Sequence, residues 1–554
     1  MNKFFVSIGA GLATILAAGP APAQTVTDPS VNLEVESVVE GLFLPTSMAF
    51  VGDEEILVLQ KNDGLVRHVV GGVLQPGSVL DVDVHVQSER GLLGIATDPD
   101  FIHTPYVYLY FTESSTGGDT NDGNSIPLGN RVYRYSWNGS GLVDPLLVLD
   151  LPATPGPNHD GGIVVFGPDD ALYAVIGDLN RNGKLQNYPA GPEPDDSGVI
   201  LRVHRSGATL TDGPFRDAGD PGNPLNRYWA YGVRNSFGMA FDPVTGELWN
   251  TENGPASYDE VNRVPPGFNS GWERIMGPDA RDADDQDDLW VAPGSAYRDP
   301  EFSWASTVAP AAIAFVASRQ LGCELEHDVI VGDDNCQQLY RFEPNAARDG
   351  LVFASPELAD RVADNGLLRC SSEQSEVLFG SSWGTVTDIE NGPDGYLYIV
   401  SLTQGRILRL VPDHGTFDDA DSDGVEDACD CAAGDSTAFA EPGEVPRIRL
   451  GAATPTTLGW DPQTATAGKG TTYQVVSGDL DSLRAAGGFA GACELAAGLA
   501  TPALGDPRAD PAPGTGVYYL TRAGNACDAG TFGDGSAPAD PRDLLDAGTP
   551  PACP

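Results

Sequence analysis

The sequence is poor in basic residues and has no long apolar run beyond its first residues. Its 554 residues contain 31 Lys and Arg against 79 Asp and Glu, a formal net charge of −48. A surface of that sign repels phosphate backbones and anionic lipids, so nucleic acid is disfavoured as a partner. Three explanations of the acidity stay open: calcium binding, a saline environment, and the solubility of an exported protein.

The first residues have the pattern of an export signal. Lys3 precedes an apolar stretch over residues 4–18, and Ala21-Pro22-Ala23 supplies the small residues of a cleavage site before Gln24. The alternative, a membrane anchor, is disfavoured because the stretch is shorter than the roughly 18 residues that span a bilayer. We therefore expect a signal peptide over residues 1–23 and a secreted or periplasmic protein without membrane insertion.

Eight cysteines are present, and none has the pairwise spacing of a zinc site. An even number in an oxidising compartment favours disulfides, although the sequence leaves their connectivity open. The haem-attachment pattern Cys-x-x-Cys-His is absent. If the protein transfers electrons, it must therefore pass them to a separate, external acceptor.

Helical periodicity is nearly absent, and short β-rich runs separated by Gly, Pro, Asn and Asp predict an all-β protein. The runs repeat as an apolar strand, a turn and a second apolar strand. A long, regular repeat favours a propeller over a β-sandwich, and six units predict six blades over residues 30–412. The units begin near Met48, Ile95, Val164, Met239, Ile313 and Ile389.

The composition changes after Leu410. Aspartates recur at alternate positions around Gly424, a spacing that can wrap one hard cation such as calcium. This linker, residues 413–445, resembles a thrombospondin type-3 calcium repeat; the alternative is an acidic linker without metal. Residues 446–554 contain strand-like runs and loosely resemble a fibronectin type-III β-sandwich. The candidate ligands in the linker are Asp419, Asp421, Asp423, Asp427 and Asp430.

Unusual polar residues occur in the turns of the repeat. Asn158 and His159 precede the strand that begins at Val164, and the paired glycines at 161 and 162 allow a ligand to approach the backbone closely. A histidine there is a candidate base because its ordinary pKa lies near neutrality. Taken alone, it is equally compatible with a surface loop.

Several further motifs together resemble the glucose/sorbosone dehydrogenase family of soluble quinoproteins. The resemblance spans residues 42–410. Its motifs are Glu89-Arg90-Gly91-Leu92-Leu93-Gly94, Asn158-His159-Asp160-Gly161-Gly162, Gly232-Val233-Arg234-Asn235, Glu252-Asn253-Gly254-Pro255, Asp259-Glu260-Val261-Asn262, Gly267-Phe268-Asn269-Ser270-Gly271-Trp272, and Trp304 before Val308-Ala309-Pro310.

The resemblance implies a six-bladed propeller that binds pyrroloquinoline quinone (PQQ) with calcium and oxidises a sugar. His159 would take the proton from the anomeric hydroxyl, while Arg234 and Asn235 would stabilise negative charge on the quinone. Glu89 and Asn158 match positions on the sugar side of the pocket.

The resemblance also implies two calcium sites. Carbonyls at Gly254 and Pro255 would hold the cofactor's calcium, and a second ion would use the Glu260 carboxylate and the Ser270 carbonyl. Three further residues match pocket positions, with the last of them stacked near the quinone: Asn253, Asp259 and Trp304.

The sequence departs from the family where the carboxylates of PQQ are bound. Members of the family use one lysine and two arginines there, whereas this chain has Asn335, Thr385 and Thr387. Losing such charge-assisted contacts weakens cofactor binding by orders of magnitude unless other groups replace them. Candidate replacements are Arg341, Arg406 and Arg409, although their strand positions are those of ordinary blade residues.

Three functions follow. The first is PQQ- and calcium-dependent oxidation of an aldose or oligosaccharide at C1 to the lactone. The second is a non-catalytic propeller of the hedgehog-interacting-protein kind that binds a carbohydrate or protein, which the missing basic residues favour. The third, a calcium-dependent adhesive protein, rests on the linker and the C-terminal module and is compatible with an enzymatic propeller.

Overall fold

The structure is a computed structural model. It describes residues 24–284, 286–364, 370, 373–413, 418–445, 447–451, 455–486, 488–489, 491–512, 514–533, 542–546 and 548–553. The predicted signal peptide lies outside these residues. Within the described residues, no helix has the length and apolar character needed to cross a bilayer.

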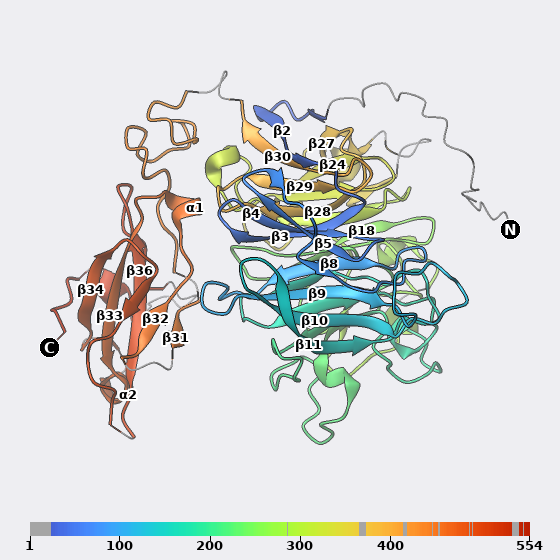
Figure 1. The fold of residues 1–554 in the computed structure, drawn as a ribbon, viewed down its shortest axis with the longest axis horizontal. Helices are drawn as coiled ribbons and strands as arrows, with labels where there is room; N and C mark the ends of the chain where they lie inside the picture. Colours follow the sequence, from blue (N-terminus) through green and yellow to red (C-terminus); the bar gives the residue numbers. More distant parts are fainter. Residues whose placement is uncertain are drawn as a thin grey trace.

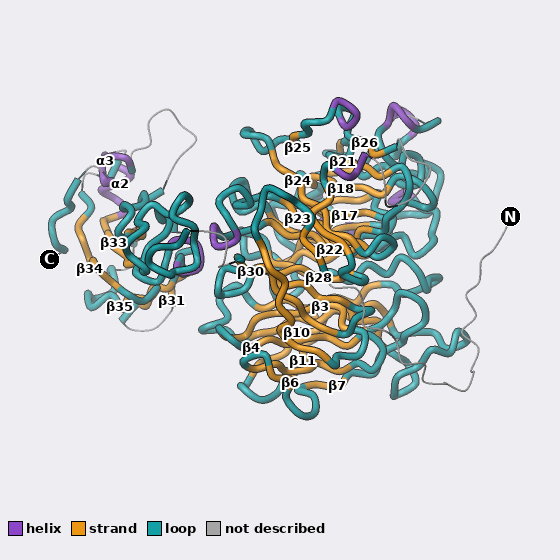
Figure 2. Tube along the Cα trace, turned by 90° about the horizontal axis from the view of Figure 1, so that it is seen from above, coloured by secondary structure: helices purple, strands orange, loops and turns teal. Residues whose placement is uncertain are grey.

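Six sheets, antiparallel except for outer parallel pairs in the third and fourth, stand around a common axis (Figures 1 and 2). Each innermost strand contacts the next until the sixth contacts the first. The predicted six-bladed propeller is confirmed, and all six predicted repeat starts fall within these innermost strands. They are β3 (Pro45–Gly52), β8 (Leu92–Thr97), β12 (Val164–Phe166), β16 (Gly238–Phe241), β22 (Pro310–Phe315) and β28 (Val386–Asn391).

Most blades are meanders of successive strands. The first adds β4 (Glu55–Gln60), β5 (Leu65–Val70), β6 (Val73–Leu74) and β7 (Leu80–Asp81), and the second adds β9 (Tyr106–Glu113), β10 (Gly129–Trp137) and β11 (Leu142–Leu151). The third adds β13 (Leu172–Ile176), β14 (Val199–Val203), β15 (Tyr228–Tyr231), β19 (Phe268–Asn269) and β20 (Ala296–Tyr297). The fourth adds β17 (Leu248–Glu252), β18 (Asp259–Val264), β21 (Phe302–Trp304) and β26 (Val362–Ala363).

The last two blades each take a strand from the N-terminus. The fifth adds β23 (Val329–Asp333), β24 (Gln338–Pro344), β25 (Leu351–Val352) and β27 (Leu378–Ser381), which pairs with β1 (Thr25–Val26). The sixth adds β29 (Leu397–Ser401) and β30 (Arg406–Pro412), and β2 (Leu33–Glu40) is its outer strand. Pairing an early strand with the last strands of the propeller closes the ring and covers a sheet edge.

The C-terminal module contains two three-stranded sheets (Figure 1). One has β31 (Arg449–Gly451), β32 (Thr457–Gly459) and β35 (Ala503–Gly505), and the other has β33 (Thr472–Asp479), β34 (Cys493–Leu499) and β36 (Val517–Gly524). Leu458, Trp460 and Tyr473 pack between them, which confirms a small β-sandwich. Its helices are α1 (Thr464–Ala467), α2 (Leu480–Ala486) and α3 (Asp543–Asp546). The fibronectin type-III resemblance stays a prediction.

All eight cysteines form disulfides, as the sequence predicted. Cys323–Cys429 joins the fifth blade to the linker, and Cys431–Cys527 joins the linker to the β-sandwich. The other two bonds, Cys336–Cys370 and Cys493–Cys553, lie within the propeller and the module. The linker is therefore tied to both of its neighbours.

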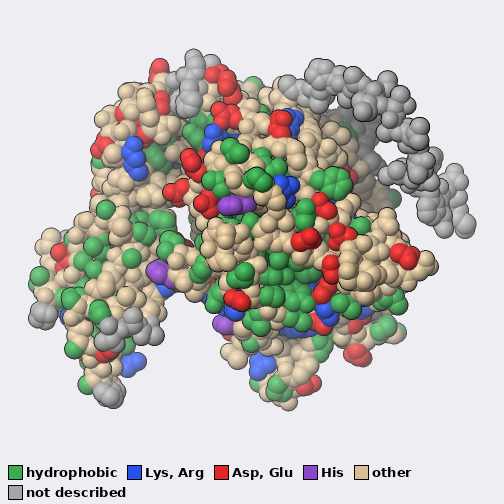
Figure 3. Space-filling view, viewed as in Figure 1, with side chains coloured by type: hydrophobic (Ala, Val, Ile, Leu, Met, Phe, Trp, Pro, Cys, Tyr) green, Lys and Arg blue, Asp and Glu red, His purple; other side chains and the backbone are tan. Residues whose placement is uncertain are grey.

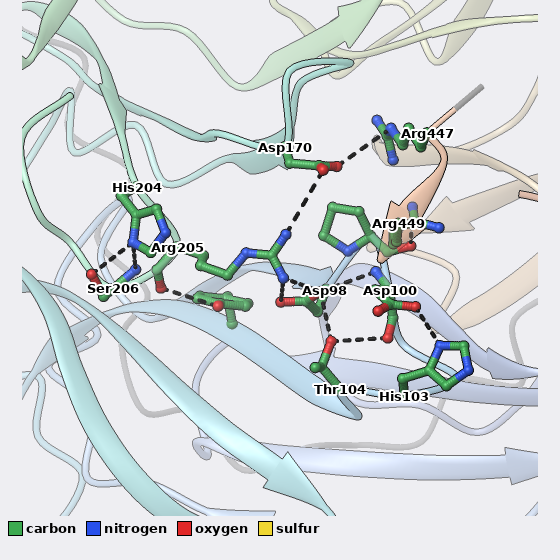
Figure 4. A network of polar contacts seen from close by, with 12 residues as sticks. Asp98, Asp100, His103, Thr104, Asp170, His204, Arg205, Ser206, Arg447 and Arg449 are labelled. Carbon is green, nitrogen blue, oxygen red and sulfur yellow. Dashed lines mark hydrogen bonds and ion pairs between the residues drawn. The ribbon is translucent and has the colours of Figure 1, made fainter. Parts of the chain in front are cut away.

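The module docks on turns that follow the innermost strands of the second and third blades (Figure 4). Arg447 Nη2 donates to the Gly167 carbonyl and Arg449 Nη2 to the Pro99 carbonyl, each at 2.9 Å. Figure 4 shows the ion pair of Arg447 with Asp170, which lies in the same turn as Gly167. Figure 3 shows the surface hollowed between module and propeller, so contact is limited to part of the boundary. The candidate site residues precede these strands, so the module lies at the opposite end of the propeller from them.

Candidate active site

A pocket of about 580 Å³ opens where the innermost strands begin. Residues from all six blades line it. Among them are six of the residues that the sequence analysis singled out: Glu89, Asn158, His159, Arg234, Asn235 and Asn253.

His159 is held by a carboxylate that the sequence analysis missed. Its Nδ1 lies 2.6 Å from Asp178 Oδ1, and Trp272 Nε1 donates to Asp178 Oδ2 at 2.6 Å. His159 and Asp178 are 8% and 3% exposed. Because Asp178 accepts the Nδ1 proton, Nε2 is left as the atom that can take a proton from a ligand.

The backbone brings His159 close to Arg234. His159 has a φ of 64°, a left-handed conformation that few non-glycine residues adopt. Gly177 lies between these two residues, and a Cβ there would stand 2.5 Å from the carbonyl oxygens of both His159 and Arg234. Only glycine permits this approach.

Glu89 links two of the predicted catalytic residues. Its Oε2 accepts from the backbone N–H of His159 at 2.6 Å and from Asn235 Nδ2 at 3.2 Å. Lys61 Nζ donates to the carbonyls on either side of Glu89, those of Ser88 and Arg90, at 2.8 and 2.7 Å. Burial lowers the pKa of Lys61 to about 8.

Arg234 precedes the innermost strand of the fourth blade, next to the third blade, whose innermost strand follows His159. Its Nη1 donates to the Asn253 carbonyl at 2.6 Å, and its guanidinium lies 5.1 Å from the Trp272 ring. Burial lowers the pKa of Arg234, while Asp178 and Glu252 act against that shift. Three buried polar atoms here have no partner in the part of the chain that the structure describes, and they suit the polar edge of a bound ligand: Arg234 Nε, Asn235 Oδ1 and Asn253 Oδ1.

Asp259 fixes the turn that contains Gly254 and Pro255. Its Oδ1 accepts from the Gly254 N–H at 2.8 Å and its Oδ2 from the Ala309 N–H at 2.6 Å. A Cβ on Gly254 would meet the carbonyl oxygens of Ser257 and Tyr258 at 2.1 and 2.5 Å. The turn therefore brings the carbonyls of Ser257 and Tyr258 close to Gly254, and carbonyl oxygens are ligands of the kind that calcium takes. Burial raises the pKa of Asp259 to about 6.

Glu260 faces a second buried carboxyl, Glu252, across the β17–β18 pair. Ser270 Oγ donates to Glu252 Oε2 at 2.7 Å, and the Gly277 N–H donates to Glu260 Oε1 at 2.6 Å. Burial raises the pKa of both carboxyls, and the charge of Glu252 raises that of Glu260 further. Glu260 and Ser270 both lie beside Glu252, but the contact of Ser270 is made by its hydroxyl and not by the predicted carbonyl. The two buried carboxyls are oxygen ligands of the kind that a hard cation takes.

Trp304 lies outside the pocket. It is 1% exposed and packs against Phe302, Tyr340 and Phe342 in the core between blades. The aromatic ring beside Arg234 is that of Trp272 instead.

The candidate replacements for the family's basic residues also lie elsewhere. Arg341 pairs with Asp28 and Asp328, Arg406 lies beside Glu40, and Arg409 pairs with Glu36 and Asp394, and none of the three arginines lines the pocket. Asn335 Nδ2 donates to the Thr307 carbonyl, and its neighbour Asp334 lines the pocket with Thr385 and Thr387. Among the described residues, this wall therefore offers no cation that could pair with the carboxylates of PQQ.

The linker brings three of its five predicted ligands together. The carboxylate oxygens of Asp419, Asp421 and Asp423 lie within 4.8 Å of one another. Both carboxylate oxygens of Asp421 are buried without a partner among the described residues. Asp427 and Asp430 are outside this group and accept from the N–H groups of Ala420 and Ala432.

Sequence reasoning missed Asp178 and Glu252, although both follow a recognisable signal. Glu252 is the last residue of the buried strand β17, and Asp178 comes two residues after the end of the buried strand β13. Trp272 was visible as the last residue of the Gly-Phe-Asn-Ser-Gly-Trp motif. Polar residues at the ends of inner blade strands lie near the central pocket, which is the pattern to search for.

Known proteins share this propeller. "Aldose sugar dehydrogenase YliI" of Escherichia coli K12 is 26% identical over 398 residues, covering 69% of this chain and 93% of its own. "Quinoprotein glucose dehydrogenase B" of Acinetobacter calcoaceticus is 28% identical over 276 residues, covering 46% and 55%. A solved structure from Thermus thermophilus, assigned as an oxidoreductase (glucose dehydrogenase), is 30% identical with a TM-score of 0.51, covering 68% and 100%.

The Glucose / Sorbosone dehydrogenase family profile matches residues 42–409, which include every pocket residue described above. The chain belongs to the glucose/sorbosone dehydrogenase family.

Proposed function

We propose that the protein oxidises an aldose or oligosaccharide at C1 to the lactone, with PQQ and calcium, outside the cytoplasm. The observation that carries this proposal is the buried His159–Asp178 pair next to Arg234 in one pocket. A base, its orienting carboxylate and a fixed cation are the groups that removal of a hydroxyl proton and hydride together requires.

His159 would act as the base. Its Nε2 takes the proton of the sugar hydroxyl, and Asp178 stabilises the imidazolium that forms while fixing the ring. PQQ, when bound, supplies the oxidant that accepts the hydride. Glu89 accepts from both the His159 N–H and the Asn235 amide. It therefore fixes the base relative to the amide that would contact the oxidant.

Arg234 and Asn235 would bind the oxidant's carbonyl edge. The Asn253 carbonyl and the Trp272 ring hold the guanidinium, so it needs no reorganisation as negative charge develops. The unpartnered polar atoms of Arg234, Asn235 and Asn253 support this end of the pocket as the quinone side. The wall formed by the fifth and sixth blades, with Asp334 and two threonines, fits the cofactor's carboxylates poorly.

Calcium would be held at three places. The carbonyls of Gly254 and Pro255 would take the cofactor's ion, Glu260 with the Ser270 carbonyl a structural one, and the linker a third. The unpartnered, buried Asp421 oxygens support the linker site. The thrombospondin type-3 resemblance of this linker is part of the proposal.

A second candidate is a non-catalytic propeller that binds a carbohydrate or protein in the same pocket. The specific observation that favours it is the lack of basic side chains among the described residues on the wall formed by the fifth and sixth blades. A binding protein has no need for the His159–Asp178 pair, which favours the enzyme.

The test is addition of PQQ and calcium to the purified protein, followed by dye reduction across a panel of aldoses and oligosaccharides and by absorbance titration of the quinone. His159→Gln should abolish dye reduction, while His103→Gln, a substitution of an exposed histidine outside the pocket, should leave it intact. Quinone binding without turnover in any sugar would favour the second candidate. Deleting residues 413–554 separates the propeller's activity from the role of the C-terminal module.

A further inference from the structure

One wall of the pocket is built from a carboxylate and hydroxyls. The fifth and sixth blades contribute Asp334, Thr385, Thr387 and Thr403 to it. Asp334 is exposed to the pocket, whereas Thr385 is 8% exposed. Among the described residues of this wall there is no lysine or arginine. The wall therefore carries net negative charge.

Each of the cations elsewhere in the pocket already donates to a backbone carbonyl. Among the described lining residues these are Lys61 and Arg234. Lys61 Nζ is bound to two carbonyls near Glu89, and Arg234 Nη1 to the Asn253 carbonyl. None of these contacts involves Asp334, so among the described lining residues neither cation pairs with that carboxylate.

The hydrogen bonds of the wall leave acceptors and hydroxyl donors for a ligand. Thr385 Oγ1 donates to Asp334 Oδ1 at 2.6 Å, which leaves Oδ2 as an acceptor. Thr403 Oγ1 accepts from the Thr385 N–H at 2.9 Å, which leaves its own proton to donate. A ligand hydroxyl can satisfy both groups, whereas a ligand carboxylate cannot donate to Asp334 and is repelled by it.

We infer that Asp334 and Thr385 form a selectivity element that accepts an uncharged hydroxyl group and disfavours a carboxylate. The inference rests on the proposed function because it concerns the same pocket. It implies that no ion pair holds a carboxylate of the quinone at this wall, and that a neutral saccharide is preferred to an acidic one.

The first test is titration of the apoprotein with PQQ in calcium, followed by quenching of tryptophan fluorescence. Asp334→Asn keeps the acceptor for Thr385 and removes the charge, so it should bind PQQ about fivefold more tightly than the wild type. Thr385→Arg should bind at least about tenfold more tightly, and this gain should disappear as NaCl rises. Asp144→Asn, on the outer strand β11, is the matched control and should change nothing. Equal or weaker binding by Asp334→Asn overturns the inference.

A second test needs no quinone. The wild type should bind cellobiose about fivefold more tightly than cellobiouronic acid, and Asp334→Asn should bind the two equally. If no form of the protein binds PQQ, the quinone part of the proposed function fails, and the saccharide pair still decides the role of the wall. A wild type that binds the acid as well as the neutral disaccharide, or neither of them, overturns the inference.

Discussion

His159 Nδ1 and Asp178 Oδ1 lie 2.6 Å apart, and the other oxygen of the same carboxylate accepts from Trp272 Nε1. Asp178 is thus fixed from two sides, and its backbone N–H donates to the Arg234 carbonyl at 2.9 Å. One residue therefore sets the orientation of the base and the position of the cation. A change at Asp178 should affect chemistry more than binding.

We expect Asp178→Asn to lower kcat by about 10²- to 10⁴-fold with little change in KM. The amide can donate to Nδ1, which moves the ring proton to Nε2 and removes the proton acceptor. Steady-state dye reduction measures the effect, and PQQ titration shows whether the pocket is intact. Asp144→Asn is the control. A rise in KM at unchanged kcat would contradict this role.

Lys61 donates to the carbonyls on either side of Glu89, so we expect it to act through that residue. Lys61→Met removes both bonds to the carbonyls that flank Glu89, so the Glu89 carboxylate should hold the His159 N–H less firmly. We expect faster hydrogen exchange at the His159 amide and a fall in kcat/KM of about tenfold. Lys61→Arg should restore part of both. Unchanged exchange at His159 would show that Lys61 has no positioning role.

The sequence predicted the blades better than the site. The innermost strands are recognisable as apolar runs before turns rich in Gly, Asp and Pro, because both faces of a blade are buried. His159 and Arg234 could be found because they lie in motifs. Asp178 lies in none of these motifs, and its place two residues after a buried strand does not reveal its contact with His159, which the fold creates across the close approach at Gly177. Trp304 was placed at the quinone from its motif, and only packing shows that its ring points into the core.

The linker carboxylates should bind calcium. Calcium is expected to raise the melting temperature of the module, and Asp421→Asn should weaken binding by about tenfold because it removes one of three converging carboxylates. Calorimetric titration measures the affinity. Asp418→Asn, an exposed neighbour outside the cluster, is the control. Equal affinity in all three proteins would place the ion elsewhere.

The Cys323–Cys429 disulfide should hold the linker against the propeller. Replacing both cysteines by serine releases a cross-link between residues 106 positions apart, which we expect to cost about 2–4 kcal/mol of unfolding free energy. Limited proteolysis should then cut within residues 413–445. The Cys493→Ser/Cys553→Ser variant is the control, because that bond lies within the module and should leave the linker protected.

Asp333 makes the stability of the fifth blade depend on pH. Burial raises the pKa of Asp333 from its ordinary 3.8 to about 7, and its partners are the Gln338 N–H and the Tyr340 hydroxyl. The folded state therefore holds a proton that the unfolded chain releases, so this stabilisation is complete below pH 4 and is lost as the pH rises through 7.

Asparagine at this position mimics the protonated acid and should remove that dependence. When the pH is raised from about 4.5 to about 8, the unfolding free energy of the wild type should fall by roughly 3 kcal/mol more than that of Asp333→Asn. Urea titrations at the two pH values measure the difference, and Asp144→Asn should behave as the wild type. The neighbouring charge of Asp334 adds to the shift, so Asp334→Asn should give a smaller change in the same direction. If the unfolding free energies of Asp333→Asn and the wild type fall equally between the two pH values, Asp333 is already ionised in the folded protein at the lower pH.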